Sequence, residues 1–205
     1  MSIDAILLIG PTGAGKSPLG DHIERRGLSG RRCLHFDFGH QLRSAALSDR
    51  PPEELTEAEH LFIKDVLEKA LLLEQQHFPI AQKIVSAFVR SRQYAEGDLM
   101  VLNGLPRHID QAVAMDSIVS VGAVVVLECT AEVVRARIRT DAGGDRSGRD
   151  DDETGLIEKK LALFRERTEA LIDHYAGRDC RVLRISISEE TAAEDAYLML
   201  LESLG

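Results

Sequence analysis

Residues 10–17 read Gly10-Pro11-Thr12-Gly13-Ala14-Gly15-Lys16-Ser17. This octapeptide matches the pattern G-x-x-x-x-G-K-[ST] at every defined position. It follows an apolar run from Ile3 to Ile9 and precedes a segment with helical character, which is the context that the pattern requires. The glycines let successive backbone N–H groups turn toward one anion, and the helix N-terminus adds partial positive charge. The stretch therefore predicts a loop that binds the phosphates of a nucleoside triphosphate.

Two side chains of this loop carry specific expectations. Lys16 is expected to reach the β- and γ-phosphates, and the Ser17 hydroxyl is expected to reach Mg²⁺. We therefore expect ATP and Mg²⁺ as ligands, with all eight residues of the loop around the phosphates. The alternative is a chance glycine-rich turn, which the flanking strand and helix disfavour. The loop alone does not say which reaction follows.

Short apolar segments bounded by turn residues recur along the chain and indicate strands. They are Ile3 to Ile9, Arg32 to Phe36, Leu99 to Leu102, Ala123 to Leu127 and Arg181 to Ile187. Strands this apolar are typical of a parallel sheet that is covered on both faces. We therefore expect one α/β domain over residues 1–205, with three layers around a five-stranded parallel sheet.

Between these strands, apolar residues recur at helical spacing. One stripe lies behind a capping box at Thr56 and Glu59 and consists of Ala58, Phe62, Val66, Ala70 and Leu73. Another stripe consists of Ile157, Leu161, Phe164, Leu171 and Tyr175. Pro79 is expected to open a helix, and Thr191 with Glu194 is expected to cap the last one. The stretch from Asp141 to Asp152 is rich in glycine and charge and is interpreted as a mobile cover.

The composition and net charge of the chain disfavour some classes of function. The 205 residues are 44% apolar with a net charge of −9, which is an ordinary globular composition and a poor one for nucleic-acid binding. A nucleotide site must then be locally basic. Cys33, Cys129 and Cys180 have neither metal-ligand nor disulfide spacing and are expected to be free thiols. No secretory leader pattern and no apolar run of membrane-spanning length is present, so we expect a cytoplasmic protein without a membrane partner.

Further motifs follow the second and third predicted strands. They are Phe38-Gly39-His40-Gln41-Leu42-Arg43, and Asn103-Gly104-Leu105-Pro106-Arg107 with Gln111 four residues on. Arg135, Arg137 and Arg139 precede the cover segment, and Ser147-Gly148-Arg149 with Asp151-Asp152 closes it. In order and spacing these motifs resemble the adenylate kinase family. Gly39 to Arg43 is similar to its T-G-D-x-L-R segment, and Gly104 to Arg107 with Gln111 is similar to its D-G-[FY]-P-R-x-x-x-Q segment.

The resemblance implies a P-loop fold with a monophosphate-binding insertion at about residues 38–80 and a short lid at about residues 140–151. It implies transfer of the γ-phosphoryl group of Mg·ATP to a nucleoside monophosphate, AMP above all, by a protein that is commonly monomeric. Arg43 and Arg107 would hold the acceptor phosphate, with Gly39 beside it, and Gln111 would contact the acceptor base. Arg139 and Arg149 would close over the transferring group. Lys160 falls where the family has a further arginine and is another candidate catalytic cation.

These cations have a physical rationale. A monophosphate is already an anionic nucleophile, so catalysis reduces to positioning and charge neutralisation, and no general base is needed. Planar guanidiniums suit phosphate better than ammonium groups do. Arg135 and Arg137 are interpreted as ordinary surface charges, Asp151 and Asp152 as acids that complement a helix dipole, and His40 as a solvated side chain.

Several positions depart from the family pattern. Asn103 stands where the family has the aspartate that helps to hold Mg²⁺, and Lys160 stands where it has an arginine. Asp37 and Phe38 replace a small polar pair near the acceptor base. Asp37 ends the second strand as Asn103 ends the third, so one hypothesis is that Asp37 supplies the missing metal-site carboxylate. The other is that Asp37 only caps the following helix turn.

Three functions stay open at this point. The first is a nucleoside monophosphate kinase. The second is a P-loop kinase for another small acceptor with a hydroxyl group, which would need a base such as Asp37. The third is a nucleotide sensor without catalysis, which the changes at Asn103 and Lys160 favour. Fold alone does not separate them.

Overall fold

The structure is a computed structural model, and it describes residues 2–69, 71, 73–144, 154–178 and 180–205. Five parallel strands form one sheet in the order β2-β3-β1-β4-β5. The strands are β1 (Ile3–Ile9), β2 (Cys33–Asp37), β3 (Leu99–Asn103), β4 (Val119–Glu128) and β5 (Arg181–Ser186). The expected α/β fold with a five-stranded parallel sheet is confirmed. Strand β4 begins before Ala123 because Val119 to Val121 pair with the start of β1.

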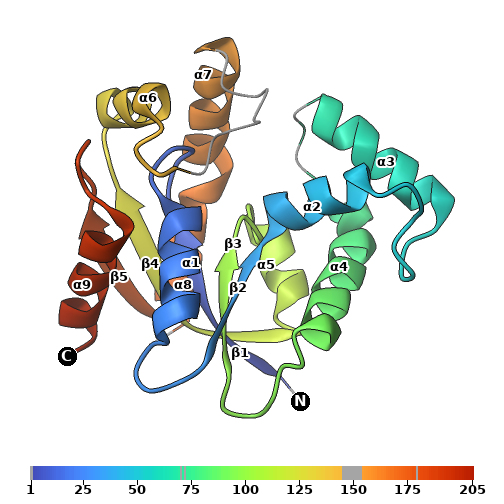
Figure 1. Cartoon of the computed structure of the whole chain (residues 1–205), viewed down its shortest axis with the longest axis horizontal. Coiled ribbons are helices and arrows are strands. Elements are labelled where there is room, and N and C mark those ends of the chain that lie inside the picture. Colours follow the sequence, from blue (N-terminus) through green and yellow to red (C-terminus); the bar gives the residue numbers. More distant parts are fainter. Residues whose placement is uncertain (1, 70, 72, 145–153, 179) are drawn as a thin grey trace.

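Helices cover both faces of this sheet (Figure 1). The α-helices are α1 (Lys16–Arg26), α2 (Phe38–Leu47), α3 (Glu57–Glu68), α4 (Phe78–Ser91), α5 (Ile109–Met115), α6 (Ala131–Thr140), α7 (Thr154–Leu163), α8 (Ala170–Ala176) and α9 (Ala193–Leu204). A 3₁₀ turn η1 (Gln75–His77) precedes α4, and a π-helical turn η2 (Phe164–Thr168) joins α7 to α8. Figure 1 shows α2 and α3 on one side of the sheet's upper end, with α6 and α7 on the other side.

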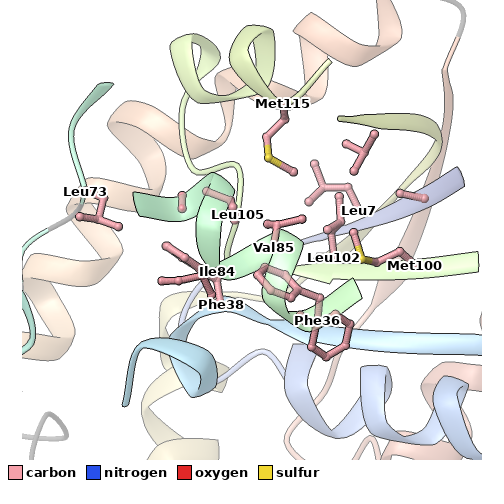
Figure 2. Close-up of a cluster of buried hydrophobic side chains, with 14 of the residues drawn as sticks. Leu7, Phe36, Phe38, Leu73, Ile84, Val85, Met100, Leu102, Leu105 and Met115 are labelled. Atoms are coloured by element: carbon pink, nitrogen blue, oxygen red, sulfur yellow. The ribbon is translucent and has the colours of Figure 1, made fainter. Parts of the chain in front are cut away.

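The two larger of the three apolar clusters in the described residues lie between the sheet and its helices. The cluster under α1 and α9 includes Leu8, Leu19, Ile23, Val125 and Leu200. The cluster under α4, α5 and α8 is the larger one (Figure 2), and its labelled members are Leu7, Phe36, Phe38, Leu73, Ile84, Val85, Met100, Leu102, Leu105 and Met115. Alternate residues of one strand, such as Leu7 and Leu8, therefore serve opposite faces. This is the reason why the strand sequences are almost continuously apolar.

The ends of helices α3 and α4 can be compared with the caps and bounds predicted from the sequence. The capping box is confirmed, since the Thr56 hydroxyl accepts from the Glu59 N–H and the Glu59 carboxylate accepts from the Thr56 N–H. Helix α3 nevertheless ends at Glu68, so Leu73 is buried in the core from outside that helix. Pro79 lies in the first turn of α4, as expected.

The predicted cap at Thr191 and Glu194 is wrong. Helix α9 begins at Ala193, and the Asp195 carboxylate accepts from the Ala192 N–H at 2.9 Å. The Thr191 hydroxyl accepts instead from the Ser188 N–H at 2.9 Å, so it shapes the loop before the helix.

The topology brings functional segments together at one edge. In parallel strands all carboxyl ends meet at the same side of the sheet. The residues that follow β1, β2 and β3 are the phosphate loop, the start of α2 and Gly104.

Two further predictions concern the chain as a whole. In the described ranges no helix is long and apolar enough to cross a membrane. Cys33, Cys129 and Cys180 are free thiols.

Candidate active site

The phosphate loop between β1 and α1 has the backbone that its glycines predict. Gly13 has a φ of 77° and Gly15 a φ of 98°, values that side chains with a Cβ rarely adopt. A Cβ on Gly13 would also lie 2.8 Å from Cγ1 of Ile138, because α6 packs against the loop. The Lys16 ammonium donates to the carbonyl oxygens of Gly10 and Pro11, each at 2.7 Å. Two carbonyl groups of the loop therefore bind the ammonium group of Lys16, the first residue of α1.

A polar cluster lies beside this loop, at the ends of β2 and β3. Ser17 Oγ donates to Asp37 Oδ2 at 2.5 Å. Asn103 Nδ2 donates to Ser17 Oγ at 3.0 Å and to Asp37 Oδ2 at 2.9 Å. Asp37 and Asn103 are direct partners in the register of the two strands. The Asn103 amide therefore orients the Asp37 carboxylate toward Ser17.

The same carboxylate also caps a helix. Asp37 Oδ1 accepts from the His40 N–H at 2.8 Å at the start of α2, while Oδ2 serves Ser17 and Asn103. The predicted cap of α2 is therefore confirmed for one oxygen of Asp37, while the role of the other oxygen at a metal site stays a prediction. His40 itself is exposed on α2, as expected for a solvated side chain.

The Asp37 carboxylate stays ionised at neutral pH. Burial raises the pKa of Asp37, but hydrogen bonds from the Ser17 hydroxyl and the His40 N–H, with the charges of His35 and Arg43, together lower it below its ordinary value. A group whose pKa is lowered on folding stabilises the fold above its unfolded pKa, and this contribution is lost as pH falls through the folded pKa. The charge is therefore present across the physiological range.

A cleft of about 250 Å³ opens between the phosphate loop and α2–α3. Four cations line it from separate segments, namely Lys16, Arg43, Arg107 and Lys160. Arg107 Nε donates to the Gly104 carbonyl at 2.9 Å, so its guanidinium lies at the end of β3. A Cβ on Gly39 would lie 3.2 Å from an Arg43 guanidinium nitrogen, which places that group at the end of β2. The chain is acidic overall, and its cleft is locally basic, as a phosphate site requires.

Gln111 is placed differently from the other predicted binding residues. It is 2% exposed and does not line the cleft. Its Oε1 accepts from the Arg107 N–H at 2.9 Å, and its Nε2 donates to the Leu73 carbonyl at 2.6 Å. The amide joins two segments of the cleft wall in this conformation, and its contact with an acceptor base stays a prediction.

The remaining predicted residues lie outside the cleft or outside the described chain. Pro11 and Ala14 belong to the phosphate loop but do not face the cleft, and Arg139 is exposed near the end of α6. Arg149 and most of the predicted lid lie outside the described residues. Phe38 is 3% exposed and belongs to the large apolar cluster (Figure 2), so it does not form a wall of the cleft.

Arg137 is the residue that the sequence analysis missed. It was interpreted as a surface charge, which is wrong, because it is only 4% exposed. Its Nε donates to the Gly13 carbonyl at 3.1 Å. One terminal nitrogen donates to the carbonyls of Ser188 (2.9 Å), Glu189 (3.2 Å) and Thr191 (2.8 Å). The guanidinium thus joins α6, the phosphate loop and the loop before α9.

A signal for this burial was present in the sequence. Val134, Arg137 and Ile138 recur at helical spacing, and all three are buried on one face of α6. Arg135 lies on another face and pairs with Glu158 at 2.9 Å, so its interpretation as a surface charge is correct.

We expect Arg137→Met to lower the free energy of unfolding by about 3 kcal/mol, because buried carbonyl groups lose their donors. Arg135→Ala on the same helix should change it by less than about 0.5 kcal/mol. Urea denaturation of both variants measures the difference. Equal stabilities would mean that the carbonyl contacts of Arg137 add nothing to the fold.

No family model matches the chain, but known proteins align with nearly all of it. An adenylate kinase of Synechococcus sp. (strain WH7803) is 30% identical over 207 residues, and the alignment covers 98% of each protein. The chain belongs to the adenylate kinase family. An adenylate kinase of Synechococcus sp. (strain RCC307) is 29% identical over 178 residues, or 84% of this chain and 85% of that protein. One from Haloarcula marismortui is 25% identical over 208 residues, or 87% and 88%.

Because the chain belongs to this family, three of its residues can be compared with the family pattern. Asn103, Phe38 and Lys160 are described positions at which the chain departs from the family pattern given above, whereas its phosphate loop matches that pattern. Lys160 lines the cleft and so keeps a positive charge where the family pattern has an arginine. Asp37 lies beside Asn103, its partner in the register of β2 and β3.

Proposed function

We propose that the protein is an ATP-dependent phosphotransferase that moves the γ-phosphoryl group of ATP to a nucleoside monophosphate, with AMP as an acceptor. The observation that carries this proposal is the convergence of Lys16, Arg43, Arg107 and Lys160 on one cleft of an acidic chain. Four cations from separate segments suit two phosphate-bearing substrates that must be held together despite their mutual repulsion. The relatives named adenylate kinase support AMP as the first acceptor to test.

The reaction needs little covalent chemistry from the protein. An oxygen of the acceptor phosphate attacks the γ-phosphorus, and the bond from this phosphorus to the β–γ bridging oxygen breaks, so ADP leaves. The attacking oxygen is already anionic and has no proton to remove. Catalysis therefore rests on alignment and on neutralising charge as it shifts.

The proposed roles of the cations follow the family resemblance, and the positions of the described ones are compatible with them. Lys16 would neutralise the β- and γ-phosphates at the start of α1. Arg43 and Arg107, at the ends of β2 and β3, would hold the acceptor phosphate, with Gly39 beside it. Lys160 would contact the transferring group. We extend the same role to Arg139 and Arg149 on the family resemblance. Residues 38–80 would form the acceptor-binding insertion, and residues 140–151 the lid.

The site fits a magnesium ion through oxygen atoms. A hydroxyl and an ionised carboxylate, those of Ser17 and Asp37, lie 2.5 Å apart beside the phosphate loop, and Mg²⁺ prefers oxygen ligands. When bound, the ion would neutralise phosphate charge during transfer. Asn103 would hold the carboxylate in place from β3. Within the described part of the chain, no three His, Cys, Asp or Glu side chains gather into a separate metal site.

The test is phosphorylation of AMP by Mg·ATP, followed through ADP formation, with Lys16→Ala as the inactive control. We expect turnover in the native protein and a loss of at least about a hundredfold in the variant. ATP binding without transfer to any nucleoside monophosphate would contradict the proposal and favour a nucleotide sensor. Transfer to a small hydroxylated compound alone would favour the other kinase.

A further inference from the structure

Two further segments of the chain bind the backbone of Arg107, the residue proposed to hold the acceptor phosphate. The Arg107 N–H donates to Oε1 of Gln111 on α5 at 2.9 Å. Its carbonyl oxygen accepts from the hydroxyl of Thr168 in η2, also at 2.9 Å. Because the guanidinium is attached to this backbone, its position depends on both α5 and η2.

The same two segments are joined a second time through the chain between α3 and α4. Gln111 Nε2 donates to the carbonyl of Leu73 at 2.6 Å, and Leu73 lies at the margin of the large apolar cluster (Figure 2). The next residue, Glu74, accepts two hydrogen bonds from Arg167 of η2, at 3.0 and 3.1 Å. Arg167 directly precedes Thr168. The contacts therefore form a closed ring, which runs through Arg107, Gln111, Leu73, Glu74, Arg167 and Thr168.

The pair of Arg167 and Glu74 is the charged link of this ring. Two hydrogen bonds between a guanidinium and a carboxylate fix their orientation as well as their distance. The bonds from Arg167 lower the pKa of Glu74, so the carboxylate is ionised at neutral pH. The side chains of Arg167 and Glu74 are 26% and 53% exposed, and pairs at such exposure add little to the stability of a fold. The pair therefore suits a role in local geometry better than a role in overall stability.

The turn η2 also forms part of the cleft. The Glu169 N–H donates to the Phe164 carbonyl at 3.0 Å, five residues back, which is π-helical geometry. Turns of this kind are rare and are frequent at functional sites. Phe164 and Thr168 line the cleft together with Lys160 of α7, the helix that η2 continues. The ring therefore connects the helix that carries Lys160 with the backbone that carries Arg107.

We propose that Arg167 and Glu74 are positioning residues for the acceptor monophosphate. Their ion pair closes the ring that holds the Arg107 backbone, and the Arg107 guanidinium in turn binds the phosphate. This inference rests on the proposed function. It predicts that breaking the pair weakens the use of the acceptor and spares the use of ATP, because ATP binds at the phosphate loop, outside the ring.

The experiment compares Arg167→Met and Glu74→Gln with the unmodified protein, with AMP and ATP varied separately. We expect kcat/KM for AMP to fall by about tenfold in each variant, which is less than the roughly hundredfold that a 1 Å misplacement can cost. KM for ATP should change by less than about twofold. Arg178→Met is the matched control, since it breaks a 2.7 Å pair with Asp116 between the chain after α8 and the chain after α5. This control should leave both values unchanged.

Two double variants test whether the pair acts as a unit and through Arg107. Arg167→Met combined with Glu74→Gln should lose no more activity than either single variant, because both remove the same link. Arg167→Met in an Arg107→Ala background should cause no further loss. A full additional loss in that background, or equal losses for AMP and ATP, would show a general disturbance of the fold and would overturn the inference.

Thermal unfolding separates a positioning role from a loss of stability. The midpoint should fall by less than about 4 °C in each single variant, as expected for a partly exposed ion pair. Unchanged kcat/KM for AMP in both variants would overturn the inference and leave the proposed function standing. Transfer to no monophosphate by the unmodified protein would contradict the proposed function, and the inference with it. Glu74→Gln remains decisive if Arg167→Met does not fold.

Discussion

Asp37→Asn is expected to lower kcat for phosphoryl transfer by about 10²–10³-fold and to weaken its dependence on Mg²⁺. The reason is that Asp37 supplies the charged oxygen next to Ser17, at 2.5 Å from its hydroxyl, while its strand partner Asn103 is neutral. The measurement is the initial rate as a function of Mg²⁺ concentration. Asparagine caps helices about as well as aspartate does, so α2 should be retained.

A charge-swapped variant makes this test sharper. Asp37→Asn combined with Asn103→Asp places the carboxylate one strand away, where the family pattern has it, and keeps one amide and one acid in the pair. We expect the double variant to recover most of the lost turnover, and Asn103→Asp alone to stay active. Unchanged turnover and unchanged Mg²⁺ dependence in Asp37→Asn would show that Asp37 serves only as the cap of α2.

Arg107→Ala is expected to lower kcat/KM for the monophosphate by about 10³-fold, since arginines that neutralise phosphoryl-transfer charge are worth about 10³–10⁵. The structure holds this residue at three points. Its N–H donates to Gln111, its carbonyl accepts from Thr168, and its Nε donates to Gly104. Steady-state kinetics with varied acceptor concentration measures the loss.

Two further variants define what Arg107 contributes. Arg107→Lys keeps the charge but loses the planar fork and the bond to Gly104, so we expect it to recover only part of the activity. Arg181→Ala, at the opposite end of the sheet and exposed, should leave the rate unchanged. If Arg107→Ala were as active as Arg181→Ala, the assignment of the acceptor phosphate to the end of β3 would be wrong.

Local patterns predicted much of this protein because their causes are local. The phosphate loop needs only its glycines, its lysine and the flanking strand and helix. The capping box at Thr56 and Glu59 depends on residues three apart in the chain, and both of its bonds are present. The strand positions follow from burial on both faces of a parallel sheet, so their apolar runs could be read directly. The proximity of Asp37 and Asn103 was also predictable, since both end strands of that sheet.

Tertiary structure decided the features that depend on distant partners. Arg137 and Gly13 are 124 residues apart, and Gln111 and Leu73 are 38 apart, so no local pattern reveals their hydrogen bonds. Phe38 could have faced a ligand or the core, and packing within the apolar cluster chose the core. The sequence by itself determined the phosphate loop, the sheet and the family motifs, because these arise from spacing along the chain. Which polar groups remain available to a substrate was decided only by folding, because a buried donor or acceptor takes whichever partner the fold brings within reach.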